Sequence, residues 1–244
     1  MTSLTSPAPA QAARQMKTIG LLGGMSWEST IEYYRLLNQI VKARMGGLHS
    51  AKILMYSVDF EELVHLKHKG DWGKIGRILS EAATQIEDGG ADCILLATNT
   101  MHKVADNIAM STTIPLIHIA DATAEAIKQQ DLHRVGLLGT RFTMEESFYK
   151  DRLIYQHGLA VQVPDSEDRD FVHDVIYDQL CLGDIRPASR DRFRTIIGEL
   201  TNSGAEAIIL GCTEIGLLVK KEDSTVPLFD TTEIHARAAV DWAL

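Results

Sequence analysis

Short apolar runs alternate along the chain with longer segments in which apolar residues recur every three or four positions. The runs are typical of buried strands, and the longer segments are typical of amphipathic helices. This alternation predicts an α/β fold in which mostly parallel sheet is covered by helices on both faces. The predicted strands lie at residues 17–22, 52–59, 93–97, 115–119, 134–139, 159–163, 207–210 and 227–229.

Glycines and polar capping residues predict where the helices begin and end. The first helix is expected to end near Met45, because residues 46–47 are both glycine. Asp121 is expected to cap one helix, and Thr143 with Glu146 has the spacing of a capping box for a helix to about residue 157. Further helices are predicted at residues 73–87, 102–110, 168–182, 187–202, from 214 onward, and at the C-terminus up to 244.

The second half of the sequence repeats the first, which indicates a duplication. The matched pairs, in the same order, are IGLLGGM at 19–25 with VGLLGTR at 135–141, GADCILLATNT at 90–100 with GAEAIILGCTE at 204–214, and PLIHIADATAEA at 115–126 with PLFDTTEIHARA at 227–238. Duplicated α/β units tend to pack about a pseudo-twofold axis, and ligands of parallel sheets bind at the carboxyl ends of the strands. We therefore expect two pseudo-symmetric α/β domains with the active site in the cleft between them.

Composition narrows the range of functions. The net charge of −9 argues against nucleic acid or an anionic membrane as partner, and no apolar run approaches the roughly 20 residues that span a bilayer. Three cysteines without regular spacing fit neither a disulfide framework nor a zinc site, and free thiols suit a cytoplasmic protein. The acidic residues and histidines show no metal-ligand spacing. Residues 1–15 lack the apolar middle of a signal peptide and are expected to be a disordered extension.

Two strand ends carry the candidate chemistry. Cys212 follows the apolar run at 207–210, and Thr98 occupies the matching position of the first half. Racemisation at a carbon acid needs a base on one face and a proton donor on the other. A thiol serves well when nearby donors or a helix N-terminus lower its pKa. Helix starts at Asn99, Thr100 and Thr213 are expected to supply donors for the substrate carboxylate, although helix capping alone is the alternative role for these residues.

The sequence resembles the aspartate/glutamate racemases over essentially residues 16–244. The residues that carry the resemblance are GLLGGMS at 20–26, TNTMH at 98–102, GT at 139–140 and LGCTEI at 210–215. The resemblance implies a two-base amino-acid racemase that needs no cofactor, with Cys212 as one base and Thr98 where the family usually has a second cysteine. It also implies that the last strand and helix return to the first domain. The expected domains are thus residues 16–115 plus 226–244, and residues 116–225.

Several further residues are candidates for the substrate site. Met25 and Ser26 lie on the turn after the first strand, Thr140 and Thr143 lie on the matching turn of the second half, and Glu214 is expected to act mainly as a first-turn helix acid. Cys93 is expected to be an inert core residue, and Cys181 to be packed on a helix. For His102, the sequence leaves open both a place in the pocket wall and a place on a helix surface.

The sequence therefore predicts a cofactor-independent racemase of aspartate or glutamate with no metal. An amino acid is the expected partner, and a homodimer is left open. One alternative is a decarboxylase of a malonate-like acid that uses a single cysteine. The other is an amino-acid-binding protein without catalysis.

Overall fold

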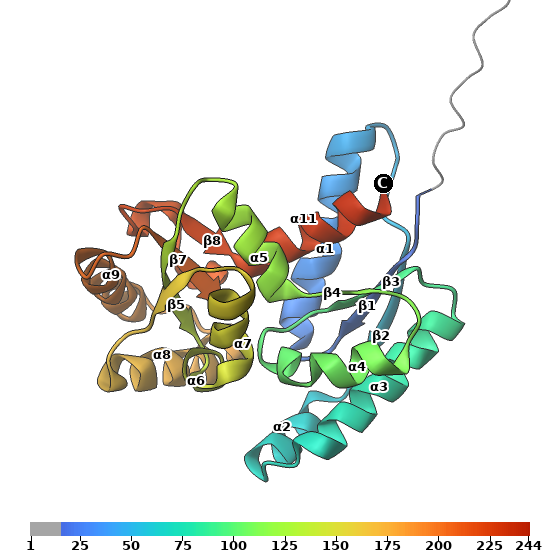
Figure 1. Ribbon diagram of the computed structural model, residues 1–244, viewed down its shortest axis with the longest axis horizontal. Helices are drawn as coiled ribbons and strands as arrows, with labels where there is room; N and C mark the ends of the chain where they lie inside the picture. Colours follow the sequence, from blue (N-terminus) through green and yellow to red (C-terminus); the bar gives the residue numbers. More distant parts are fainter. Residues whose placement is uncertain (1–15) are drawn as a thin grey trace, which may run out of the picture.

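The computed structural model describes residues 16–244, so the predicted extension at residues 1–15 lies outside the described part. The chain forms two four-stranded sheets in which every pair of neighbouring strands is parallel (Figure 1). The strand orders, β2-β1-β3-β4 and β6-β5-β7-β8, are equivalent, which confirms the duplicated α/β fold. The strands are β1 Ile19–Gly23, β2 Ile53–Ser57, β3 Cys93–Leu96, β4 Leu116–Ile117, β5 Arg134–Gly139, β6 Ala160–Gln162, β7 Ala207–Gly211 and β8 Leu228–Asp230.

Helices connect the strands and cover both sheets. The α-helices are α1 Trp27–Met45, α2 Phe60–His68, α3 Trp72–Asp88, α4 Ala105–Ser111, α5 Ile119–Lys128, α6 Arg141–Glu145, α7 Ser147–Asp151, α8 Ser166–Asp178, α9 Pro187–Asn202, α10 Ile215–Leu218 and α11 Thr231–Ala243. Shorter turns are η1 Thr100–Val104, the π-helical η2 Arg152–Gln156, η3 Leu180–Leu182 and η4 Lys221–Asp223. Within residues 16–244, every helix is too short or too polar to span a membrane.

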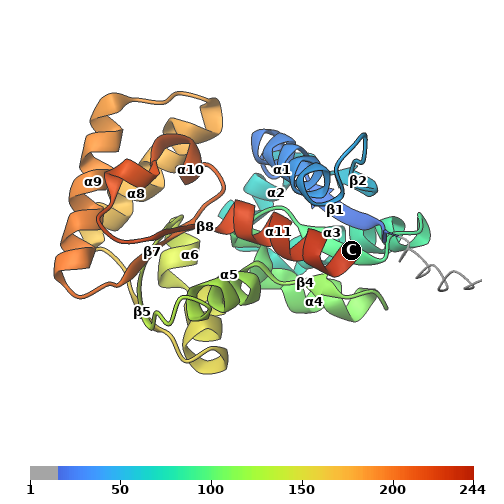
Figure 2. The ribbon, with the colours of Figure 1, turned by 90° about the horizontal axis from the view of Figure 1, so that it is seen from above.

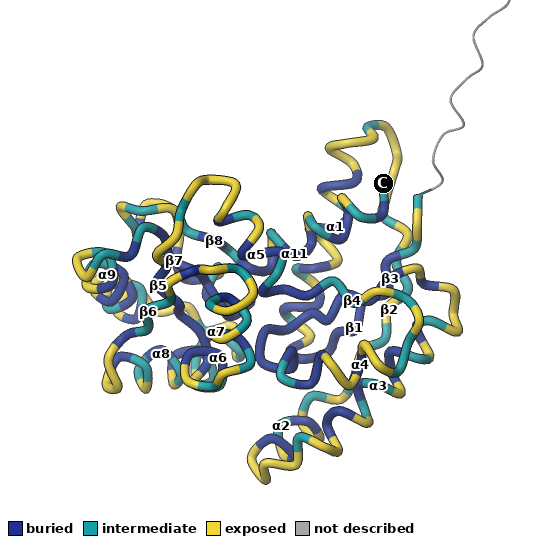
Figure 3. Tube along the Cα trace, viewed as in Figure 1, coloured by how far each residue is buried: buried dark blue, intermediate teal, exposed yellow. Residues whose placement is uncertain are grey.

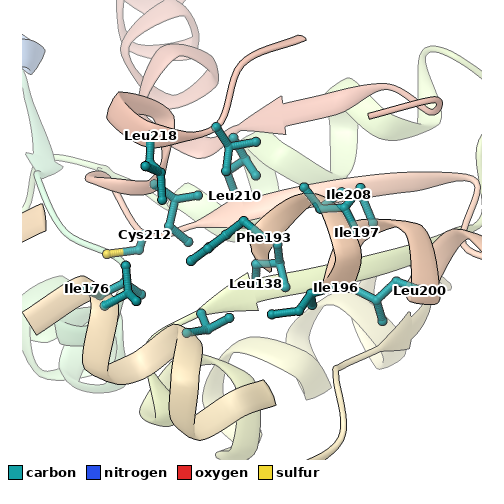
Figure 4. Packing of buried hydrophobic residues seen from close by; sticks show 14 of the residues in the cluster. Leu138, Ile176, Phe193, Ile196, Ile197, Leu200, Ile208, Leu210, Cys212 and Leu218 are labelled. Carbon is teal, nitrogen blue, oxygen red and sulfur yellow. The ribbon is translucent and has the colours of Figure 1, made fainter. Parts of the chain in front are cut away.

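The two central strands of each sheet, β1 with β3 and β5 with β7, are almost fully buried between the helices (Figure 3). In the second half, Phe193 and Ile197 of α9 pack with Ile176 of α8 and with residues of β5 and β7 (Figure 4). Cys212 lies at the edge of this cluster, with its sulfur beyond the packed carbon atoms. This apolar packing fixes the position of the carboxyl end of β7. A ligand in the cleft would bind against that end.

The last helix crosses from the second half to the first. Ala236, Ala239 and Val240 of α11 share a buried cluster with Leu21 of β1 and Leu37 of α1 (Figure 2). The last helix is expected to return to the first half, and it does. The last strand is expected to return there as well, and that prediction is wrong. β8 pairs with β7 in the second sheet, and β4 pairs with β3 in the first. Apart from these two strands, the division into domains stays a prediction.

Two local predictions are corrected by the structure. Asp121 does not cap α5, because that helix begins at Ile119 and His118 is its N-cap; Asp121 instead pairs with Arg152. Thr143 does not cap the next helix, since it lies inside α6, where Thr140 accepts a hydrogen bond from the Thr143 N–H. The sequence pattern leaves the segment between residues 59 and 73 unassigned, and the structure places α2 there, capped by Asp59.

Three histidine rings are buried together where α11 meets the end of the first half. The ring of His102 lies 4.5 Å from that of His118 and 5.8 Å from that of His235, measured between ring centres. His235 donates from Nε2 to the carbonyl of Ile117 at 2.7 Å and accepts at Nδ1 from the Tyr33 hydroxyl at 2.9 Å. These bonds use both ring nitrogens of His235 in the neutral form.

His102 anchors the chain directly behind one candidate catalytic residue. Its Nδ1 donates to the carbonyl of Thr98 at 2.7 Å, and its Nε2 accepts from the N–H of Ile119 at 3.2 Å. Burial lowers the pKa of all three histidines, that of His235 to about 4 and that of His118 to about 3. The folded protein therefore keeps these rings neutral at a pH where the unfolded chain protonates them.

We predict that this cluster makes the protein lose stability in mild acid. Unfolded histidines bind protons below a pKa of about 6.5, whereas the folded rings resist protonation down to their lowered pKa values. The stabilisation is thus fully present above pH 6.5 and falls as the pH decreases toward 4, by about 2 kcal/mol at pH 5 for one such histidine. Urea unfolding at pH 7.5 and pH 5 measures this difference.

The matched variants are His235→Asn, which removes one buried ring, and His133→Asn, which changes an exposed histidine. We expect the pH dependence to shrink in the first variant and to persist in the second. An unfolding free energy of the wild type that is the same at both pH values would contradict this prediction.

Candidate active site

The carboxyl ends of β3 and β7 open into one cavity between the two halves. The space between its wall atoms, including the part that opens to solvent, is about 430 Å³. Its walls come from both halves of the chain and include most of the residues that the sequence predicted for the site. The lining residues are Met25, Phe60, Lys67, Thr98, Asn99, Thr100, Met101, Thr140, Ile176, Tyr177, Cys181, Gly211, Cys212, Thr213 and Glu214.

Cys212 follows β7 directly and is buried against the second core. Its Sγ donates a hydrogen bond to Oε2 of Glu214 at 2.9 Å. Burial first, and then the nearby Glu214 carboxylate, raise the pKa of Cys212 well above its usual value. The expectation that nearby donors lower this pKa is therefore wrong, because burial and the neighbouring anion both favour the neutral thiol.

Glu214 joins the two halves through its carboxylate. Oε2 accepts from Cys212 and from the Thr213 hydroxyl at 2.7 Å, while Oε1 accepts from the hydroxyls of Ser26 at 3.0 Å and Ser29 at 2.5 Å. Ser26 and Ser29 belong to the N-terminus of α1, where negative charge is stabilised by free N–H groups and by the helix dipole. Glu214 was expected to be mainly a first-turn acid of its own short helix. It instead lies beside the reactive thiol, within reach of the thiol proton.

Thr98 holds the matching position at the end of β3. It is buried and lines the cavity, and its hydroxyl makes no hydrogen bond with any side chain or backbone group of residues 16–244. Its carbonyl is fixed by His102. The hydroxyl is therefore available to a ligand, and it reaches the cavity from the opposite half to Cys212.

Asn99 presents an unpaired acceptor in the cavity wall. The hydroxyl of Thr231 donates to the carbonyl of Leu210 at 2.8 Å, so it must accept from the Asn99 Nδ2 that lies 3.1 Å away. This fixes the orientation of the amide and leaves Oδ1 of Asn99 buried without a partner. A buried acceptor without a donor is costly, and the ammonium group of an amino acid would satisfy it. This acceptor role differs from the donor role that the sequence predicts for the Asn99 side chain.

Donors for a carboxylate come from the backbone at the two strand ends. The N–H groups of Asn99 and Thr213, which occupy matching positions of the repeat, bond to no acceptor within residues 16–244. The hydroxyls of Thr100 and Thr140 lie 3.1 Å apart across the cleft.

Thr143 does not line the cavity; its side chain packs under Gly139 and Gly211 and supports the wall from behind.

Two lining residues, Lys67 and Tyr177, were missed by the sequence analysis. Lys67 belongs to α2, the helix that was not predicted, and its ammonium donates to the Tyr177 hydroxyl at 2.6 Å. The sequence does contain a signal for this helix, because Leu63, Leu66 and Lys67 have the spacing of one helix face. A lysine at an inward position of that face indicates a buried cation.

The other residues of interest have simpler environments. Cys93 is fully buried in β3, as expected, and burial raises its pKa to about 12. Cys181 also lines the cavity, on η3, and is not merely packed on a helix. His102 lies behind the wall, in the histidine cluster. Within the described part of the chain, no three His, Cys, Asp or Glu side chains are placed so that they could hold a metal ion.

Comparison with known proteins agrees with this geometry. The sequence model of the family described as Asp/Glu/Hydantoin racemase matches residues 22–239. A Yersinia pestis protein of known structure, assigned to the Asp/Glu racemases, is 56% identical, with a TM-score of 0.89 over 93% of this chain and 99% of that one. An aspartate racemase homologue from Pyrococcus horikoshii OT3 is 34% identical, with a TM-score of 0.82 over 93% and 99% of the two chains.

A relative with a described activity is more distant. The broad specificity amino-acid racemase RacX of Bacillus subtilis (strain 168) is 22% identical over 229 residues, which cover 91% of this chain and 96% of RacX. The family match spans nearly all of the described residues, including both strand ends that line the cavity. The chain therefore belongs to the Asp/Glu/hydantoin racemase family.

Proposed function

We propose that this amino-acid racemase acts on aspartate or glutamate without a cofactor, with Cys212 and Thr98 on opposite faces of the substrate. The observation that supports the proposal most strongly is the hydrogen bond from Cys212 to Glu214 in the same cavity as Thr98. It provides a thiol, a group that can take its proton, and a facing hydroxyl. The unpaired Oδ1 of Asn99 suits the ammonium group of the substrate.

The proposed reaction begins with a proton transfer inside the Cys212–Glu214 pair. The thiol proton moves to the carboxylate, so the pair keeps a single negative charge while the base becomes a thiolate. An ammonium group that lies nearer to the Cys212 sulfur than to the Glu214 carboxylate favours this shift, because it stabilises the thiolate more than the carboxylate. The substrate is therefore expected to help generate the base that attacks it.

The thiolate then removes the α-proton. The C–H bond breaks, its electron pair is delocalised into the α-carboxylate, and the N–H groups of Asn99 and Thr213 stabilise the resulting charge. The Thr98 hydroxyl protonates the carbanion from the other face and becomes an alkoxide. Cys212 now holds the α-proton and Glu214 the former thiol proton, so one proton passes from this pair through water to Thr98 and restores all three groups. In the reverse direction Thr98 must act as the base, which is difficult because a hydroxyl is far less acidic than a thiol.

We predict that the wild type exchanges the α-proton of L-aspartate or L-glutamate for deuterium in D₂O and that Cys212→Ala abolishes this exchange. The side chain lies at the edge of the core, so the variant should lose only about 1 kcal/mol of stability. Proton NMR of the substrate measures exchange, and thermal unfolding checks the fold. Exchange that survives in a folded Cys212→Ala protein would place the base elsewhere. CO₂ release from a malonate-like acid, without exchange, would favour the decarboxylase.

A second prediction concerns the inequality of the two faces. Exchange should be fast for the enantiomer whose α-hydrogen faces Cys212, which the family resemblance implies is the L form, and slow for the D form. Thr98→Cys restores a second thiol and should raise exchange of the D substrate. The equilibrium ratio of the enantiomers stays near one in both proteins, because a catalyst changes only the rates. Thr98→Ser is the matched control, since it keeps a hydroxyl. Equal D and L rates in the wild type would refute this account.

A further inference from the structure

Lys67 is a buried cation that reaches the cavity from the first half of the molecule. It lies on the inward face of α2 beside Leu63 and Leu66, and only 4% of its surface is exposed. Its side chain lines the same cavity as Thr98 and Cys212. A lysine in such a position is uncommon, because burial of an ammonium group is costly unless something compensates its charge.

The protein holds this ammonium in place without neutralising it. Nζ donates to the Tyr177 hydroxyl at 2.6 Å, and it lies 4.4 Å from the centre of the Tyr177 ring and 5.3 Å from that of Phe142. Tyr177 and Phe142 belong to the second half, so the contacts cross the cleft. A hydroxyl and two aromatic faces orient a cation and attract it, but they carry no negative charge.

The charge of Lys67 has no partner within residues 16–244. The buried carboxylates of Asp223 and Asp168 pair with arginines, whereas Lys67 forms no ion pair with any described residue. Burial lowers the pKa of Lys67 to about 8, which leaves most of the side chain charged at neutral pH. One of its three N–H groups is used by Tyr177, and the others have no acceptor among the described residues.

We infer that Lys67 binds the side-chain carboxylate of a dicarboxylic amino acid, with Tyr177 as the residue that positions the ammonium. The inference rests on the proposed function and names the group that selects the substrate. The other ends of the amino acid already have partners: Oδ1 of Asn99 for the ammonium, and the N–H groups of Asn99 and Thr213 for the α-carboxylate. Lys67 is fixed by Tyr177 of α8 and not by a residue of either strand end, so it is left for a second anionic group.

Substrate selectivity tests the inference directly. We compare α-proton exchange of L-glutamate with that of its uncharged isostere L-glutamine, and of L-aspartate with L-asparagine, in the wild type and in Lys67→Gln. The acid-to-amide ratio of kcat/KM should fall by about 10- to 100-fold, the loss typical of a charge-assisted hydrogen bond. Lys67→Arg keeps the charge and should retain much of the ratio. Lys69→Gln changes an exposed lysine at the end of the same helix and should leave the ratio as it is.

Two results would overturn the inference. If acids and amides lose rate equally in Lys67→Gln, the lysine serves the α-carboxylate or the fold. If neither changes, it does not contact the substrate. Thermal unfolding of each variant shows whether the protein is folded.

A measurement of substrate binding tests the role of Lys67 independently of the proposed reaction. In the Cys212→Ala background, calorimetry should show weaker binding of L-glutamate after Lys67→Gln, with a smaller change for L-glutamine. If the wild type exchanges no amino acid, the proposed reaction fails, and the calorimetric comparison still decides whether Lys67 recognises a second carboxylate. If L-glutamate binds with equal affinity with and without Lys67, the inference is refuted, whatever the exchange experiment shows.

Discussion

The carboxylate of Glu214 is the interaction on which the rest of the site depends. It is buried at the N-terminus of α1, accepts hydrogen bonds from both halves of the molecule, and holds the proton of Cys212. A buried anion is tolerated only where donors replace water, and here the hydroxyls of Ser26, Ser29 and Thr213 take that role. The same group therefore joins the two halves and, together with burial, favours the protonated thiol.

Two charges of opposite sign define the cavity. Glu214 bonds to Cys212, and Lys67 bonds to Tyr177 of α8; the proposed substrate, an amino acid with a second carboxylate, would use the charge of Lys67 for that group. Each charge is held by groups from the other half of the chain, Glu214 by α1 and Lys67 by Tyr177 of α8. The contacts that hold these two charges therefore also join the halves, because separation of the halves would expose both charges to water.

The sequence predicted the parts of this structure that depend on local pattern. Alternating apolar runs predicted the strands, the repeat predicted equivalent sheets, and both brought Thr98 and Cys212 to matching strand ends. Contacts between distant residues were not predictable: Ser26 and Glu214 are 188 positions apart, and Lys67 and Tyr177 are 110 apart. The pKa of Cys212 is unpredictable from the sequence for the same reason, since it depends on how deeply folding buries the thiol and on which charge folding places nearby.

The central claim, that Glu214 keeps Cys212 protonated until substrate binds, is tested most directly by the pH dependence of Cys212 alkylation by iodoacetamide. Mass spectrometry of the peptide that contains Cys212 distinguishes it from Cys93 and Cys181. In Glu214→Gln the amide can still bond to the neighbouring hydroxyls but carries no charge, so the thiol should ionise more readily. The account predicts that alkylation begins at lower pH in Glu214→Gln than in the wild type. An unchanged or higher pH of onset would contradict it.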